Sequence, residues 1–212
     1  KRLAEVMDWK SEPCSLGQDY GWKTCNSAIV IVSKGTDGIL LVRMVHKYPT
    51  DGSDVDIYKD DVDLSRRFNN RFIVADDCPN GYLTNQRLKN DGFPIVLFNF
   101  RSDQNAGERN RGYYLLRTAI NTGKLKLTNN AELIKQMKTT VEIKKKINVT
   151  IEAAPGERSD LVDSLCMACY PFLIKEDDSG ELISLVNYNQ DIIKTEVSDY
   201  RRDKEWAALK GN

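Results

Sequence analysis

The stretch that decides the fold is RFIVADDCPNGYLTNQRLKNDGFPIVLF, residues 71–98. It begins with a compact apolar run that ends at Asp76 and Asp77, continues through a helix-compatible segment at residues 82–89, and closes on a second apolar run at residues 93–98. Compact apolar runs of this kind are typical of strands that are buried on both faces of a parallel sheet. The stretch therefore predicts a β-α-β unit whose two strands are parallel neighbours.

The chain before this unit carries three short apolar runs, at residues 14–19, 28–32 and 39–45. The turn KGTDG at residues 34–38 separates the last two runs, as an antiparallel hairpin requires. The three runs predict a three-stranded meander. The polar, acidic stretch at residues 53–68 predicts a solvent-facing helix between the meander and the β-α-β unit.

The chain after the unit is mainly helical in its apolar spacing. Residues 108–120 and 129–138 predict two helices, and a period of two between residues 141 and 151 predicts a charged hairpin inserted after them. Ser159 is a good N-cap for a last helix at residues 160–172. Strands first, then β-α units and a late helix, predict an α/β fold with a mixed β-sheet flanked by helices.

The composition limits the class of protein. The chain has 212 residues with 31 Lys and Arg against 31 Asp and Glu, so any binding to a polyanion must come from a local basic patch. The sequence has an odd number of cysteines, 5, and no apolar run of membrane-spanning length. Cys166 and Cys169 form a single pair in an apolar run, which favours small core residues over a zinc site. We expect a soluble protein of a reducing cytoplasm, with no membrane partner.

The organisation of the chain is predicted to be one domain with short flanks. We expect residues 1–13 to be a residual linker from a preceding domain and residues 14–175 to be the folded domain. Residues 176–212 are polar, and we expect them to pack on the domain or to trail from it.

Three carboxylates stand where chemistry usually sits on such a sheet: Asp19 closes the first predicted strand, Asp76 closes the fourth, and Asp160 opens the last helix. Clustered carboxylates repel one another unless a cation neutralises them, and oxygen ligands favour Mg²⁺ or Mn²⁺. Two such ions roughly 3.5–4 Å apart can hydrolyse a phosphodiester. Taken singly, each Asp is more typical of a turn or a helix cap.

Four landmarks in a fixed order carry a family resemblance. They are GQDYG at residues 17–21 followed by NSAIVIV at 26–32, IVAD at 73–76 followed by Gly81, YYLLRTAINTGKLKL at 113–127 followed by ELIKQ at 132–136, and ERSDLVDSL at 157–165. Over roughly residues 14–173 the chain resembles the C-terminal nuclease domain of the large terminase subunit, the packaging motor of tailed double-stranded DNA bacteriophages.

This resemblance implies an RNase H-like (RuvC-like) fold in which Asp19, Asp76 and Asp160 coordinate one or two Mg²⁺ or Mn²⁺ ions. It implies an endonuclease that cuts concatemeric viral double-stranded DNA during genome packaging, by two-metal-ion hydrolysis. The implied partners are double-stranded DNA, an N-terminal ATPase domain of the same chain, a portal protein and a small terminase subunit. The implied location is the cytoplasm of the infected bacterial host and not the mature virion.

The sequence departs from the family after the first landmark, because residues 24–26 lack the further Asp of many members. A single strong metal site is thus an alternative to two. Asp77 and Glu157 are candidate auxiliary ligands, although a turn residue and an exposed loop charge are the favoured interpretations. Adjacent residues at a strand end point to opposite faces, so we predict that Asp76, and not Asp77, faces the metal.

Basic residues before and on the third predicted helix and at the tip of the hairpin are candidates for contacts to DNA phosphates. Solvated surface charge is the alternative for each of them. The candidates are Arg101, Arg109, Arg111, Lys144, Lys145 and Lys146.

Two other functions remain open at the level of sequence. A RuvC-like junction resolvase or a transposase-type nuclease would use the same three carboxylates on other DNA structures. A catalytically silent RNase H-like module would only bind DNA or the portal.

Overall fold

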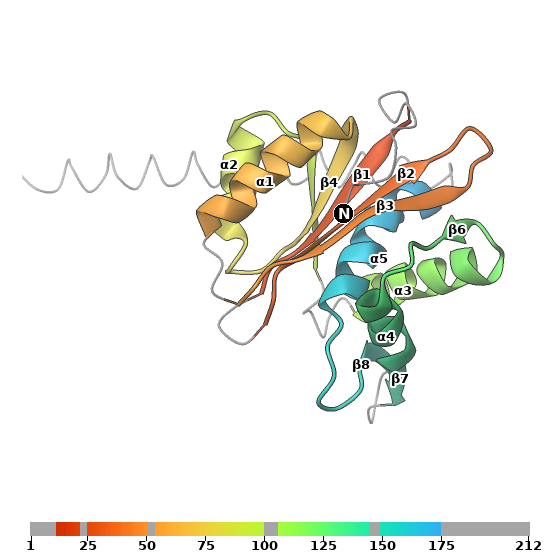
Figure 1. Ribbon diagram of the computed structural model, residues 1–212. Helices are drawn as coiled ribbons and strands as arrows, with labels where there is room; N and C mark the ends of the chain where they lie inside the picture. Colours follow the sequence, from red (N-terminus) through yellow and green to blue (C-terminus); the bar gives the residue numbers. More distant parts are fainter. Residues whose placement is uncertain (1–11, 22–24, 51–53, 100–105, 145–148, 175–212) are drawn as a thin grey trace, which may run out of the picture. The chain divides into compact units, whose positions relative to one another are not determined.

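Figure 1 shows the computed structural model of the chain, which describes residues 12–21, 25–50, 54–99, 106–144 and 149–174. Strands come first, followed by β-α units and a last helix. The elements are β1 (Cys14–Asp19), β2 (Ala28–Lys34), β3 (Leu40–Lys47), α1 (Asp54–Arg67), β4 (Asn70–Asp76), α2 (Tyr82–Asn90), β5 (Ile95–Phe98), α3 (Ala106–Asn121), β6 (Leu125–Lys126), α4 (Ala131–Thr139), β7 (Thr140–Lys144), β8 (Val149–Ala153) and α5 (Asp160–Leu173).

A six-stranded sheet of order β5-β4-β1-β2-β3-β6 lies at the centre of the described part. β1, β2 and β3 are antiparallel neighbours, which confirms the predicted meander. β4 is parallel to both β5 and β1, which confirms the β-α-β unit and places it beside the meander. The sheet is therefore mixed, as predicted. Because β1 and β4 are parallel neighbours, their carboxyl ends lie at the same edge of the sheet.

Helices cover both faces of this sheet (Figure 1). On β2, Ala28, Val30 and Val32 pack into a core with residues of α3, α4 and α5, whereas Ile29 and Ile31 pack into a second core with residues of α1 and α2. The alternation follows from the period of two along a strand. We call the two sides the α5 face and the α1 face.

The helix α5 approaches the sheet very closely at Gly17 of β1. A Cβ atom at Gly17 would lie 2.0 Å from the carbonyl oxygen of Ser164, so any larger residue would push α5 away. The hydroxyl of Ser164 donates to the carbonyl oxygen of Ala28 at 3.0 Å. Cys166 and Cys169 are buried in the same helix, as expected for small core residues. These contacts hold α5 against β1 and the start of β2.

Some boundaries differ from the prediction for local reasons. β5 begins at Ile95 and not at residue 93, because Pro94 has no N–H to give to the ladder. α4 begins at Ala131 because the side chain of Asn130 caps it, accepting the N–H of Leu133 at 2.9 Å. The charged hairpin is confirmed as the antiparallel pair β7–β8.

Other predictions concern residues outside the described part. Most of the expected linker at residues 1–13 and the expected tail at residues 176–212 belong to this group, as do Arg101, Lys145 and Lys146. Among the described residues, no helix combines the length and the apolar character that crossing a membrane requires.

Candidate metal centre

Asp19 and Asp76 leave the ends of β1 and β4 on the same face of the sheet. Gly17 faces α5, so the period of two places Asp19 on the α5 face as well. On β4, Ala75 packs into the core of the α1 face, so Asp76 points to the α5 face. The register pairs Gln18 with Ala75, one residue before the two acids. The two carboxylates therefore leave neighbouring strand ends towards the same helix.

That helix brings two more carboxylates. Asp160 is the first residue of α5, and Asp163 follows three residues later on the same side of the helix. Asp160 is buried and Asp163 is half-buried. We call Asp19, Asp76, Asp160 and Asp163 the acid cluster.

Charge repulsion and burial act together on Asp19. Burial of its carboxylate raises its pKa well above the usual range, and the nearby charges of Asp163, Asp76 and Asp160 raise it further. Asp19 keeps some exposure to solvent, and the protein atoms packed around its carboxylate are what make the charged form costly. The four acids are thus close enough to influence one another electrically.

Asp163 was not assigned a role by the sequence analysis, although it lies within the quoted stretch ERSDLVDSL. Burial raises its pKa, hydrogen bonds from Tyr113 and Ser159 and the charge of Arg109 lower it, and the charge of Asp76 raises it. Of the neighbouring charges, that of Asp163 has the largest effect on the pKa of Asp19. The sequence did carry one indication of this role, since Asp160 and Asp163 are one helical turn apart and therefore lie on the same side of the helix.

Asp160 has different surroundings. Burial raises the pKa of Asp160 most. The positive charges of Arg158 and, to a smaller extent, Lys47 lower it, and the negative charge of Asp163 raises it. Its oxygen Oδ2 is buried and has no hydrogen-bond partner among the described residues. Asp160 therefore lies at the basic side of the acid cluster, with one oxygen available to a ligand.

The acid cluster matches the chemistry of a hard divalent cation. Several desolvated carboxylates repel one another, and Mg²⁺ or Mn²⁺ relieves that repulsion through the oxygen ligands it prefers. In the described part of the chain, however, no three His, Cys, Asp or Glu side chains are arranged to hold one ion between them. A shared ion would therefore require some of the other carboxylates to turn towards Asp163.

The two auxiliary candidates point elsewhere. Asp77 is exposed, whereas Asp76 beside it is 4% exposed, and the backbone N–H of Asp77 donates to the carbonyl oxygen of Phe98. Glu157 forms an ion pair with Lys135 of α4 at 2.9 Å. These positions agree with a turn residue and a surface charge, respectively.

Ser159 stands at the N-cap of α5 as predicted, but its side chain does not cap the helix. The prediction that the Ser159 side chain caps the helix was wrong, because its hydroxyl donates to Oδ2 of Asp163 at 2.9 Å instead. The N–H of Leu161 is accepted by the side-chain oxygen of Gln136 in α4 at 2.8 Å. A helix end needs such partners, and here a neighbouring helix supplies one.

Of the candidate DNA contacts, Arg109 and Arg111 lie on α3 and are half-buried. The guanidinium of Arg109 lies 5.9 Å from the ring centre of Tyr113, and its charge lowers the pKa of Asp163. Arg109 is therefore beside the acid cluster. For Lys144 the structure describes only the backbone, at the end of β7.

No protein-family model matches the sequence, and no curated protein matches it. Solved structures do match. The large terminase nuclease of thermophilic phage G20c superposes with a TM-score of 0.66 at 15% identity, over 76% of this chain and 83% of that chain. The same nuclease with bound magnesium gives 0.64 at 16% identity, over 74% and 80%.

The large terminase of bacteriophage HK97 gives a TM-score of 0.59 at 13% identity, over 74% of this chain and 39% of that longer chain. Identities this low show the fold alone. The chain therefore has the RNase H-like fold of the nuclease domains of large terminases.

Proposed function

We propose that this chain is a metal-dependent endonuclease domain that cuts concatemeric viral double-stranded DNA during genome packaging. The observation that carries the proposal is the convergence of Asp19, Asp76 and the acids of α5 at one edge of the sheet. The likeness to phage nucleases supports it, one of which has been solved with bound magnesium.

In this proposal Asp19, Asp76 and Asp160 hold the metal, and Asp163 joins them from the next turn of α5. One or two Mg²⁺ or Mn²⁺ ions would activate a water and stabilise the leaving oxygen of the phosphodiester. The carboxylates would bind the metal and orient it at this edge of the sheet, and two of them, Asp76 and Asp160, are buried.

Arg109 and Arg111 on α3, together with Arg101 and the basic residues of the β7–β8 hairpin, Lys144, Lys145 and Lys146, would contact DNA phosphates. The net charge of +0 leaves binding to such local contacts. An N-terminal ATPase domain of the same chain, a portal protein and a small terminase subunit would complete the packaging motor. The place of action would be the cytoplasm of the infected bacterial host, and not the mature virion.

The test is cleavage of supercoiled plasmid by the 212-residue chain with Mn²⁺, with and without a chelator. We expect nicked and linear products that the chelator abolishes, because the carboxylates need the ion to relieve their repulsion. Linear duplex should be cut at least as well as a four-way junction. Strict preference for the junction would favour a resolvase, and absence of cleavage would favour a silent binding module.

A further inference from the structure

Both oxygens of the Asp163 carboxylate accept a hydrogen bond from a neutral hydroxyl. The hydroxyl of Tyr113 on α3 donates to Oδ1, and the hydroxyl of Ser159 donates to Oδ2 at 2.9 Å. Ser159 is 4 residues from Asp163 in the sequence, whereas Tyr113 is 50 residues away on another helix. The carboxylate cannot rotate without breaking one of these bonds.

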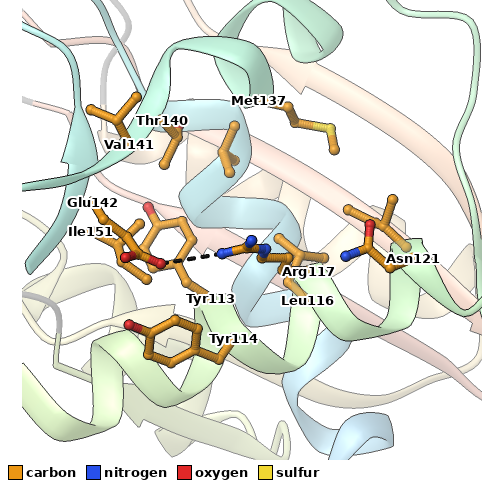
Figure 2. A pocket seen from close by; sticks show the side chains of 12 residues that line it. Tyr113, Tyr114, Leu116, Arg117, Asn121, Met137, Thr140, Val141, Glu142 and Ile151 are labelled. Carbon is orange, nitrogen blue, oxygen red and sulfur yellow. Dashed lines mark hydrogen bonds and ion pairs between the residues drawn. The ribbon is translucent and has the colours of Figure 1, made fainter.

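Tyr113 is held in place by the packing of α3 against α5. Its side chain is 5% exposed, and the adjacent Gly112 lets the helices approach, because a Cβ there would lie 2.8 Å from the sulfur of Cys166. Its ring also lines a cavity of about 480 Å³ between α3, α4 and the β7–β8 hairpin (Figure 2). The position of the hydroxyl is thus set by the core and not by the surface.

The choice of donor matters for a cation site. A hydroxyl fixes a carboxylate and leaves its charge, whereas a hydrogen-bonded ion pair with Lys or Arg cancels much of it. The charge of Arg109 acts on Asp163 as well, but each of the two carboxylate oxygens accepts a hydrogen bond from a hydroxyl. A carboxylate has about four lone-pair sites, so two hydrogen bonds leave others free for a metal. Asp163 is therefore both fixed in direction and able to accept a ligand.

We propose that Tyr113 and Ser159 are positioning residues, which hold the Asp163 carboxylate in the orientation that the metal centre uses. The proposal rests on the proposed function, because it assigns these hydroxyls a role in metal binding. Loss of either hydroxyl lets Asp163 rotate, so the ion is bound more weakly while the fold is kept.

The matched pair for the test is Tyr113→Phe and Tyr114→Phe. Both remove one hydroxyl from neighbouring tyrosines of α3, but Tyr114 is 42% exposed whereas Tyr113 is 5% exposed, and the two rings lie apart in Figure 2. The readout is the Mn²⁺ dissociation constant of the 212-residue chain, measured by paramagnetic resonance of free Mn²⁺, with circular dichroism as the check of folding. We expect Tyr113→Phe to weaken Mn²⁺ binding about 10-fold or more, as loss of an outer-sphere partner does, and Tyr114→Phe to leave it unchanged.

Ser159 gives an independent rescue experiment. Ser159→Ala removes the donor to Oδ2, whereas Ser159→Thr keeps a hydroxyl at the same position. We expect weaker Mn²⁺ binding for the first variant and near wild-type binding for the second. A purely structural role would instead change the melting temperature of both without separating their Mn²⁺ dissociation constants.

The outcomes are distinguishable from failure of the proposed function. If the wild-type chain neither binds Mn²⁺ nor cuts DNA, the proposed function is wrong and this inference falls with it. If the wild type binds Mn²⁺, and folded Tyr113→Phe and Ser159→Ala bind it equally well, the positioning role alone is overturned. Equal weakening by Tyr113→Phe and Tyr114→Phe would overturn it too.

Discussion

The two faces of the sheet bury acids in opposite ways. On the α5 face, the acid cluster is surrounded by hydroxyl donors and basic side chains, among them Tyr113, Ser159 and Arg109. On the α1 face, Asp61 of α1 is 0% exposed, and neither of its carboxylate oxygens has a hydrogen-bond partner among the described residues. Burial alone therefore does not mark a functional acid. A functional acid is instead indicated by a group of neighbouring acids with donors that orient their carboxylates.

Asp61 is in the core because of the helical period. Ile57, Leu64 and Phe68 are buried, and Asp61 follows Ile57 by four residues and precedes Leu64 by three. Burial raises its pKa well above the usual range, and the charge of Asp60 raises it further. The burial of this carboxylate away from the acid cluster costs stability.

The largest expected effect separates Asp76 from its neighbour. Asp76→Asn should reduce the initial rate of plasmid cleavage in Mn²⁺ more than about 100-fold, because the amide removes charge from the metal centre. Asp77→Asn should keep most of the activity, because Asp77 is exposed. Circular dichroism checks that both variants fold. An active Asp76→Asn with an inactive, folded Asp77→Asn would mean that the ligand lies one residue later.

A second effect ranks the two acids of α5. Asp163→Asn should weaken Mn²⁺ binding at least as much as Asp160→Asn, because two hydroxyls hold the Asp163 carboxylate in one orientation. We expect a loss of about 10- to 100-fold for each, measured as the Mn²⁺ dissociation constant. Wild-type Mn²⁺ binding by folded Asp163→Asn would show that Asp163 has no role in holding the metal.

Substitution of Asp61 should stabilise the fold, whereas substitutions in the acid cluster should cause a loss of function. The pKa of Asp61 is raised on folding, so its contribution to stability is fully present below the pKa of the unfolded chain and is lost as the pH rises through the folded pKa. Asp61→Asn should therefore increase the free energy of unfolding by about 1–3 kcal/mol at pH 8, and by less at pH 5. Urea titrations at the two pH values measure this. A destabilised Asp61→Asn at pH 8 would show that the charged form has partners.

The smallest effect concerns the auxiliary candidate Glu157. Its ion pair with Lys135 is at the surface, where the Lys135 side chain is 65% exposed. Glu157→Gln should change the free energy of unfolding by less than about 1 kcal/mol, because solvent screens such pairs. Plasmid cleavage should be unchanged, and a loss of activity would make Glu157 a ligand.

Much of the fold could be predicted from local patterns. Compact apolar runs with turn residues between them identified the meander and β4, and a cap residue with helical spacing identified α5. Asp19 and Asp76 could be located because each ends a strand run, and the period of two then gives their common face. These inferences need only neighbours in sequence.

The remaining features depend on contacts between distant residues. Tyr113 meets Asp163 where α3 packs closely on α5 beside Gly112, and no spacing in the sequence indicates that contact. The Ser159 side chain was expected to accept a backbone N–H of the first turn of α5, which is close in sequence. Its hydroxyl instead donates to Asp163, and the side chain of Gln136 in α4 accepts the N–H of Leu161. Asp61 lies at the helical spacing of the apolar residues Ile57 and Leu64, which indicates its face of the helix, but a carboxylate at that position more often turns to solvent than into a core.

The central claim is that the acid cluster binds the ion with which the chain cuts DNA. Its most direct test measures Mn²⁺ binding and plasmid cleavage together for the wild-type chain and for Asp19→Asn, which keeps the shape of the side chain. We predict that the wild type binds Mn²⁺ and cuts, and that Asp19→Asn is folded but loses both properties. Cleavage by Asp19→Asn at the wild-type rate, or wild-type cleavage that resists a chelator, would contradict the account.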